Sequence, residues 1–79
     1  SMATRKADLE KVMLGASGDT RSLYYANNGS YSDAKNYYNN LVRQYDLIKN
    51  STKPEDQDTK AYLKRIINIV ATGRNFDTV

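Results

Sequence analysis

Three carboxylates stand close together at residues 55 to 58, where they could hold a metal ion. Glu55, Asp56 and Asp58 follow Pro54 in a segment that is typical of the start of a helix. Carboxylate oxygens bind Ca²⁺ and Mg²⁺, but such sites need a complete set of oxygen ligands, which this segment lacks. Acidic residues in a first helical turn also interact favourably with the positive end of the helix dipole. We therefore expect them to stabilise a helix, and we predict neither a metal site nor a cofactor.

The residue types that carry acid–base and nucleophilic catalysis are largely missing. The chain contains no histidine and no cysteine, so a Ser-His-Asp or Cys-His arrangement cannot form. Gly15 and Gly18 form a Gly-x-x-Gly sequence, but the Lys-Ser/Thr pair of a phosphate-binding loop does not follow. Asp33 and Asp46 could form a carboxylate pair, although a core of two helices offers no pocket for a reaction. We predict that the protein is not an enzyme.

Tyrosine is the one residue type in excess, with seven tyrosines against one phenylalanine and no tryptophan. Exposed tyrosines provide rigid contact area, and arginine beside them suits either a protein-binding hot spot or base stacking. A first candidate binding cluster consists of Arg21, Tyr24, Tyr25 and Tyr31. A second candidate is a strip at helical spacing, formed by Asn36, Asn40, Arg43 and Leu47. We predict that both contact a protein partner; for the strip, the alternative is an ordinary solvated helix face.

Two long helices with a short connection are expected to position these side chains. Apolar residues recur at three- and four-residue spacing over 32–49 and 54–72, which predicts one buried stripe on each helix. The first stripe consists of Ala34, Tyr37, Tyr38, Leu41, Val42, Tyr45 and Ile48. The second consists of Thr59, Tyr62, Leu63, Ile66, Ile69 and Val70. The short connection favours an antiparallel hairpin with the stripes facing each other, and Gly73 should end it and leave 74–79 as a tail.

Two shorter helices should precede the hairpin. The first is expected to end near Leu14, with an inward face formed by Leu9, Val12 and Met13. The second is predicted over 21–27, after a break at 15–20 that is rich in glycine and cap-forming residues. The fold class is therefore all-α: a single domain over 1–79, built as a small bundle in which two short N-terminal helices pack on the long hairpin.

Residues 9–27 also carry a resemblance to a helix-turn-helix. Leu14-Gly15-Ala16-Ser17 followed by Thr20-Arg21-Ser22-Leu23-Tyr24-Tyr25 resembles the turn and recognition helix of bacterial repressors, although the glycine lies further from Leu23 than in that family. The resemblance implies a DNA-binding regulator, which is the alternative function. Its nucleic-acid-binding residues would be Arg21, Ser22, Tyr25, Lys60 and Lys64. The net charge of +3 is spread along the chain without a polybasic arm, which favours an evenly solvated surface.

Size and composition favour a binding protein. A core this small typically contributes only about 3–5 kcal/mol, so association would be a natural supplement. Ser1 resembles a residue left by tag cleavage, and a start at Met2 would make the chain a small reading frame, as in a viral or phage accessory protein. The N-terminal residues given lack the apolar core of a signal peptide, so we expect the cytoplasm or a host-cell interior. We predict a non-catalytic protein that binds another protein or itself, as a homo-oligomer; nucleic acid and a small anionic ligand between subunits stay open as partners.

Overall fold

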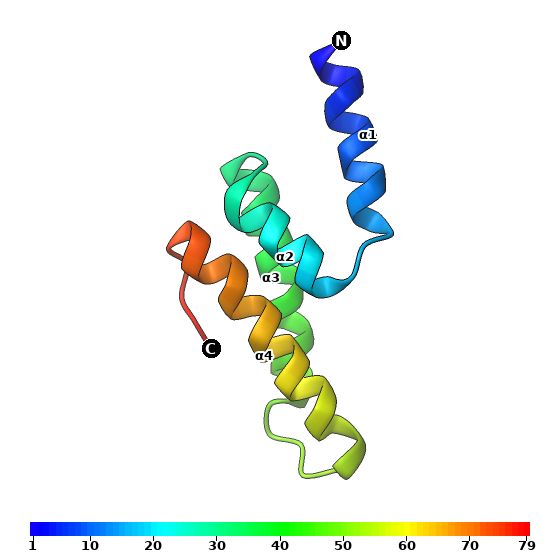
Figure 1. The fold of residues 1–79 in the computed structure, drawn as a ribbon. Coiled ribbons are helices and arrows are strands. Elements are labelled where there is room, and N and C mark those ends of the chain that lie inside the picture. Colours follow the sequence, from blue (N-terminus) through cyan, green and yellow to red (C-terminus); the bar gives the residue numbers. More distant parts are fainter.

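Four helices and no strands make up the computed structural model, which describes all 79 residues (Figure 1). In chain order the helices are α1 (Met2–Leu14), α2 (Gly18–Asn27), α3 (Tyr31–Ile48) and α4 (Pro54–Arg74). The predicted all-α class is confirmed. None of the four helices combines the length and the apolar character that crossing a membrane requires.

Serine side chains start three of these helices. The hydroxyls of Ser1, Ser17 and Ser30 accept hydrogen bonds from the backbone N–H groups of Thr4, Thr20 and Asp33, respectively. Such a cap satisfies one of the backbone donors that the first helical turn leaves without a partner. Because Ser17 is the cap, α2 begins at Gly18, earlier than the sequence predicts.

The last helix ends later than predicted. Asn75, rather than Gly73, adopts the left-handed backbone conformation (φ 59°) that closes the helix, and asparagine tolerates this conformation better than most residues. Gly73 lies instead where α4 meets α2. A Cβ atom built on it would be 2.5 Å from the Cβ atom of Ala26. The missing side chain therefore allows the two helix backbones to approach each other closely.

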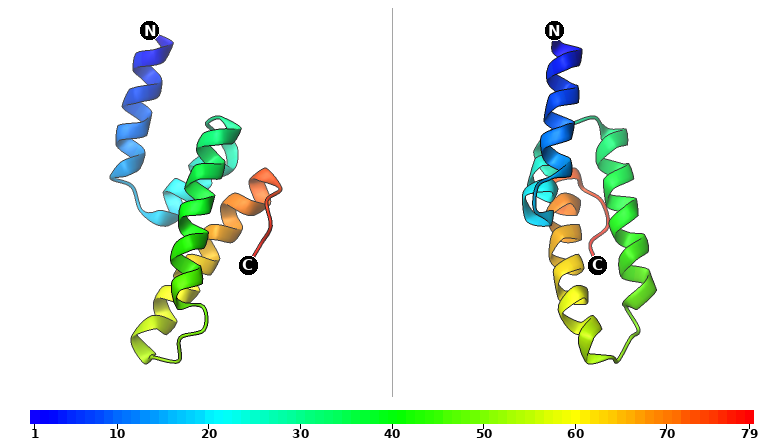
Figure 2. Two further views of the ribbon diagram at one scale, coloured as in Figure 1. Left: turned by 180° about the vertical axis from the view of Figure 1, so that it is seen from behind. Right: turned by 90° about the vertical axis from the view of Figure 1, so that its right-hand side faces the viewer.

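The apolar core lies around α4, which packs against both α2 and α3 (Figure 2). Its central cluster consists of Tyr38, Leu41, Leu63, Ile66, Ile67, Val70 and Ala71. The stripe predicted for α3 is confirmed, because all its residues are buried or half-buried. The stripe predicted for α4 is partly wrong: Ile67 and Ala71 are fully buried, whereas Thr59 and Tyr62 are exposed. One apolar stripe is sufficient for a helix that packs against one neighbour. Because α4 packs against both α2 and α3, it buries residues outside the predicted stripe.

α1 extends away from this core (Figures 1 and 2). None of its residues is buried, and its backbone approaches only α2. The inward face expected for Leu9, Val12 and Met13 is wrong for the first two, which expose 48% and 63% of their surface, whereas Met13 is half-buried. The turn at 15–17 directs the helix outward instead of along the hairpin, and its apolar side chains stay uncovered.

The residues after α4 fold back over the core, as the single large apolar residue of the tail suggests. The ring of Phe76 lies 4.9 Å from that of Tyr38, measured between centroids. The backbone of Val79 exchanges two hydrogen bonds with the side-chain amide of Asn68, at 2.8 and 3.0 Å. The tail is therefore held against α3 and α4 by ring contacts and by a paired amide.

Arg74 connects the end of α4 to the end of α2. Its guanidinium donates hydrogen bonds to the backbone carbonyls of Tyr25 (2.7 Å), Asn28 and Gly29 (2.7 Å). The last carbonyls of a helix have no partner within that helix, and a basic side chain can satisfy them. These bonds reinforce the close contact between Gly73 and Ala26 in the neighbouring turn.

Candidate functional site

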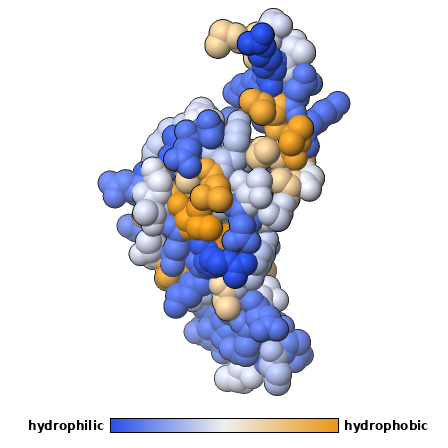
Figure 3. All heavy atoms as spheres, viewed as in Figure 1, coloured by the Kyte–Doolittle hydropathy of each residue, from blue (hydrophilic) through white to orange (hydrophobic).

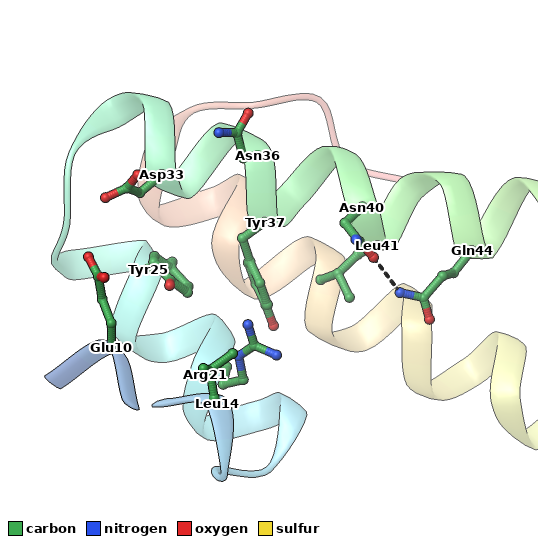
Figure 4. Close-up of a pocket in the computed structure, with 10 residues that line it drawn as sticks. All are labelled: Glu10, Leu14, Arg21, Tyr25, Asp33, Asn36, Tyr37, Asn40, Leu41 and Gln44. Carbon is green, nitrogen blue, oxygen red and sulfur yellow. Dashed lines mark hydrogen bonds between the residues drawn. The ribbon is translucent and has the colours of Figure 1, made fainter. Parts of the chain in front are cut away.

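A cleft of about 450 Å³ opens between α2 and α3, with the second half of α1 at its edge (Figure 4). Two of its lining residues, Arg21 and Tyr25, come from α2, and two, Glu10 and Leu14, come from α1. The remaining lining residues come from α3 and are Asp33, Asn36, Tyr37, Asn40, Leu41 and Gln44. The lining thus combines a single cation with carboxylates, amides and apolar walls, so the cleft offers both polar and apolar contacts to a ligand.

Arg21 is the one basic side chain in this lining. Its Cζ atom lies 5.1 Å from the centre of the Tyr37 ring, a distance at which the aromatic face attracts the cation. Its Nε is shielded from solvent without a hydrogen-bond acceptor, which costs about 1–3 kcal/mol, and no carboxylate pairs with it. By contrast, Arg65 pairs with Asp19 and Arg74 binds carbonyls. Arg21 therefore keeps unused hydrogen-bonding capacity at the cleft.

Tyr37 forms a fixed wall beside Arg21. Its hydroxyl shares a 2.6 Å hydrogen bond with the hydroxyl of Ser22 and donates to the backbone carbonyl of Gly18 at 3.3 Å. Its ring stacks on that of Tyr25, with 4.8 Å between centroids. Burial raises the pKa of Tyr37 above its ordinary value, while the hydrogen bond to Ser22 and the charge of Arg21 oppose this. The hydroxyl is therefore neutral at physiological pH, and the ring is held from both sides.

Two carboxylates at the α1 side of the cleft share one cation. The Nζ of Lys6 lies 3.9 Å from a carboxylate oxygen of Glu10 and 3.6 Å from one of Asp33. These side chains are more than a third exposed, so each pair contributes at most about 1 kcal/mol. The pair with Asp33 is the only ion pair that joins α1 to α3. Negative charge at this side of the cleft is thus already partly balanced.

A second cleft, of about 400 Å³, follows the first part of α1. It is lined by Met2, Arg5, Lys6, Leu9, Glu10, Tyr24, Tyr25, Gly29, Ser30 and Asp33. Glu10, Tyr25 and Asp33 line both clefts, so the two spaces adjoin. Open space therefore separates α1 from the α2–α3 body along much of its length.

The first cleft brings together residues from both predicted binding clusters. Arg21 and Tyr25 lie opposite Asn36 and Asn40, although the sequence places the two pairs in separate groups. Gln44, which sequence reasoning missed, continues this row of amides and donates a 2.7 Å hydrogen bond to Asn40. The sequence contained the pattern that identifies Gln44, because Asn36, Asn40 and Gln44 follow one another at four-residue spacing and so share one helix face.

The other predicted partner-binding residues lie elsewhere. Arg43 and Leu47 are exposed on α3 but do not line the cleft, and Leu47 leaves 85% of its surface uncovered. Tyr24 lines the second cleft. Tyr31 packs edge-on against Phe76, with 5.6 Å between ring centroids. The two predicted clusters therefore do not form one continuous surface.

Two residues expected to contact nucleic acid are engaged within the protein. Ser22 is fully buried beside Tyr37, because α2 turns this face towards the core, so a contact with DNA is wrong for this residue. The Nζ of Lys60 donates to the backbone carbonyl of Ser51 at 2.6 Å, in the connection between α3 and α4. Lys64 is exposed.

An ion pair fixes the start of α2 to α4. Two nitrogens of the Arg65 guanidinium donate to the two carboxylate oxygens of Asp19, at 2.9 and 3.1 Å. The hydrogen bond from Arg65 lowers the pKa of the Asp19 carboxyl below its ordinary value. Both partners of this pair have their charges satisfied, which leaves Arg21 as the α2 cation without a partner.

Comparison with protein-family models, curated proteins and solved structures finds no match to this chain.

Proposed function

We propose that this chain is a non-catalytic binding protein that associates stoichiometrically through α1, first with a second copy of itself. The observation that supports this is the uncovered apolar surface of α1, which Figure 3 shows away from the apolar patch on the body. The side chains concerned and their exposed fractions are Met2 (87%), Leu9 (48%), Val12 (63%) and Leu14 (70%). A helix of 13 residues is marginal by itself and normally depends on the packing of an apolar face.

The energy available from covering α1 is comparable in size with the cost of association. Fully burying one such apolar side chain contributes about 1.5–3 kcal/mol. Met2, Leu9 and Val12 share one side of the helix with roughly two-thirds of their surface still exposed, so covering them would contribute roughly 3–6 kcal/mol per copy. Bringing two molecules together costs about 4–15 kcal/mol, and a symmetric interface covers α1 on both copies. In the associated state a second copy would cover the side chains of α1 that the hairpin leaves exposed.

Light scattering coupled to size-exclusion chromatography tests this proposal. The variant Leu9→Ser/Val12→Ser changes α1 and leaves the buried core untouched, so we expect its mass to fall from that of an oligomer to that of a monomer. Leu47→Ser is the matched control, because it removes an exposed leucine from α3. A wild-type protein that stays monomeric at millimolar concentration would refute self-association. An oligomer that the α1 variant leaves intact would refute the role of α1.

DNA binding stays the alternative prediction, although no feature of the structure favours it. With Ser22 buried and Lys60 bound to a carbonyl, Arg21 and Lys64 would have to supply most of the phosphate contacts. Binding to duplex DNA should then weaken steeply with salt and be abolished by Arg21→Ala. Undetectable binding at low ionic strength would reject this alternative. For either function we propose the cytoplasm or a host-cell interior as the compartment.

A further inference from the structure

We infer that the cleft between α2 and α3 is a binding site for a small organic anion, a carboxylate on an apolar body, held by Arg21. This inference does not depend on the association of α1 proposed above. Three observations support it: Arg21 has no ion-pair partner, the Tyr37 ring holds its guanidinium in place, and the cleft lining around it is partly apolar (Figure 4).

The charges in the cleft call for an anion rather than a cation. Arg21 forms no ion pair, whereas the carboxylates of Glu10 and Asp33 already share Lys6. Arg21 is therefore the one charged side chain of the lining that has no ion-pair partner. A single cation with two carboxylates in the same lining is unsuited to a polyanion such as nucleic acid, which needs several converging cations. A ligand with a single carboxylate can pair with Arg21 without placing further negative charges beside Glu10 and Asp33.

The geometry around Arg21 favours a planar acceptor. The ring of Tyr37 lies against the guanidinium, and that ring is itself fixed by Ser22 and Tyr25, so the orientation of the guanidinium is held before a ligand arrives. Arginine binds carboxylates through two parallel hydrogen bonds. The Nε is shielded from solvent, whereas the two terminal nitrogens of the guanidinium are accessible, form no hydrogen bond within the protein and are the donors that such a pair can use.

The remaining walls suit an apolar body with a few polar contacts. Tyr25, Tyr37 and Leu41 supply apolar surface from α2 and α3, and Asn40 and Gln44 present amides along α3. Because Gln44 donates to the Asn40 oxygen, the amide nitrogen of Asn40 is left as a donor. A volume of about 450 Å³ lies in the usual range for small-molecule sites, so a ring with one carboxylate fits.

Nuclear magnetic resonance titration of the intact ¹⁵N-labelled protein tests the inference with three probes. Benzoate carries the carboxylate and a ring, benzamide carries the ring without the charge, and inorganic phosphate carries charge without the ring. We expect benzoate to shift the Nε–H resonance of Arg21 and the backbone resonances of Asn40 and Gln44, and to bind at least about tenfold more tightly than either other probe. Equal binding of benzamide would overturn the role of the charge, and equal binding of phosphate would overturn the apolar body.

Substitutions separate the site from general charge effects. Arg21→Gln should weaken benzoate binding by about tenfold or more, whereas Arg43→Gln, on the exposed face of α3, should leave it unchanged. Asn40→Asp keeps Arg21 and places a competing carboxylate in the cleft, so it should also abolish binding while the fold is retained. If Arg21→Gln does not fold, Asn40→Asp alone decides the question. Benzoate binding that survives Asn40→Asp, or is lost equally in Arg43→Gln, would overturn the inference.

Discussion

Replacing Gly73 by alanine should destabilise this protein, although alanine is the better helix former. A Cβ atom at this position would lie 2.5 Å from the Cβ, 2.7 Å from the carbonyl oxygen and 2.9 Å from the Cα of Ala26. Non-bonded carbon atoms pack at about 3.5–4.0 Å, so the new methyl group is about 1 Å too close. Two of the three atoms belong to the backbone of α2, which no change of rotamer can move aside.

The net effect follows from two opposing contributions. Forcing an extra methyl group into a close-packed contact costs about 1–3 kcal/mol, and the higher helix propensity of alanine returns at most about 1 kcal/mol. The expected loss in the free energy of unfolding is therefore about 1–2 kcal/mol. For a domain of this size each kcal/mol lowers the melting temperature by about 4–8 °C, so the variant should melt roughly 4–16 °C below the wild type.

Thermal unfolding followed by circular dichroism measures this difference. Gly15→Ala is the matched control, since a Cβ atom there meets nothing nearer than the Val12 carbonyl oxygen at 3.8 Å, and we expect its melting temperature to be unchanged or slightly raised. Adding Ala26→Gly to Gly73→Ala removes only one of the three close contacts, so it should restore stability only in part. A Gly73→Ala variant that melts at or above the wild-type temperature would refute the close approach of α2 and α4.

Two further predictions concern the buried tyrosines. Tyr37→Phe deprives the buried hydroxyl of Ser22 of its hydrogen-bond partner, so it should lower the free energy of unfolding in urea by about 1–3 kcal/mol. Adding Ser22→Ala should restore part of this loss. A Tyr37→Phe variant as stable as the wild type would contradict this prediction. Burial raises the pKa of Tyr37 and of Tyr38 above the ordinary 10.0, so the folded state retains protons that the unfolded chain loses. Stability should accordingly be constant below about pH 10 and fall as the pH rises through the folded-state pKa values, and urea midpoints that stay constant across this interval would contradict it.

The sequence predicts those parts of the fold that depend on neighbouring residues along the chain. The stripe of α3 and the position of Pro54 at the start of α4 follow from local spacing and backbone chemistry, and the structure confirms them. The failures come from contacts between distant segments. Ile67 and Ala71 were missed because α2 covers a second face of α4, and periodicity alone does not show how many neighbours a helix has.

The cleft shows the same division. Sequence reasoning selected Arg21, Tyr25, Asn36 and Asn40 by residue type, and the structure brings these four together. It could not place them on one cavity, because their proximity depends on how α2 packs against α3. It also assigned Ser22 to a nucleic-acid surface, since a small polar residue gives no sign in the sequence that its hydroxyl will be paired and buried.

The hydrogen bonds of Arg74 have a consequence for the order in which the chain folds. The carbonyls of Tyr25, Asn28 and Gly29 receive their partner from a residue 45 to 49 positions later in the sequence. On the ribosome, α2 would be synthesised long before Arg74, so these three carbonyls would have no partner within the protein until α4 is nearly complete. Folding of the core should therefore be a late, cooperative event that closes a long loop rather than a stepwise addition of finished helices.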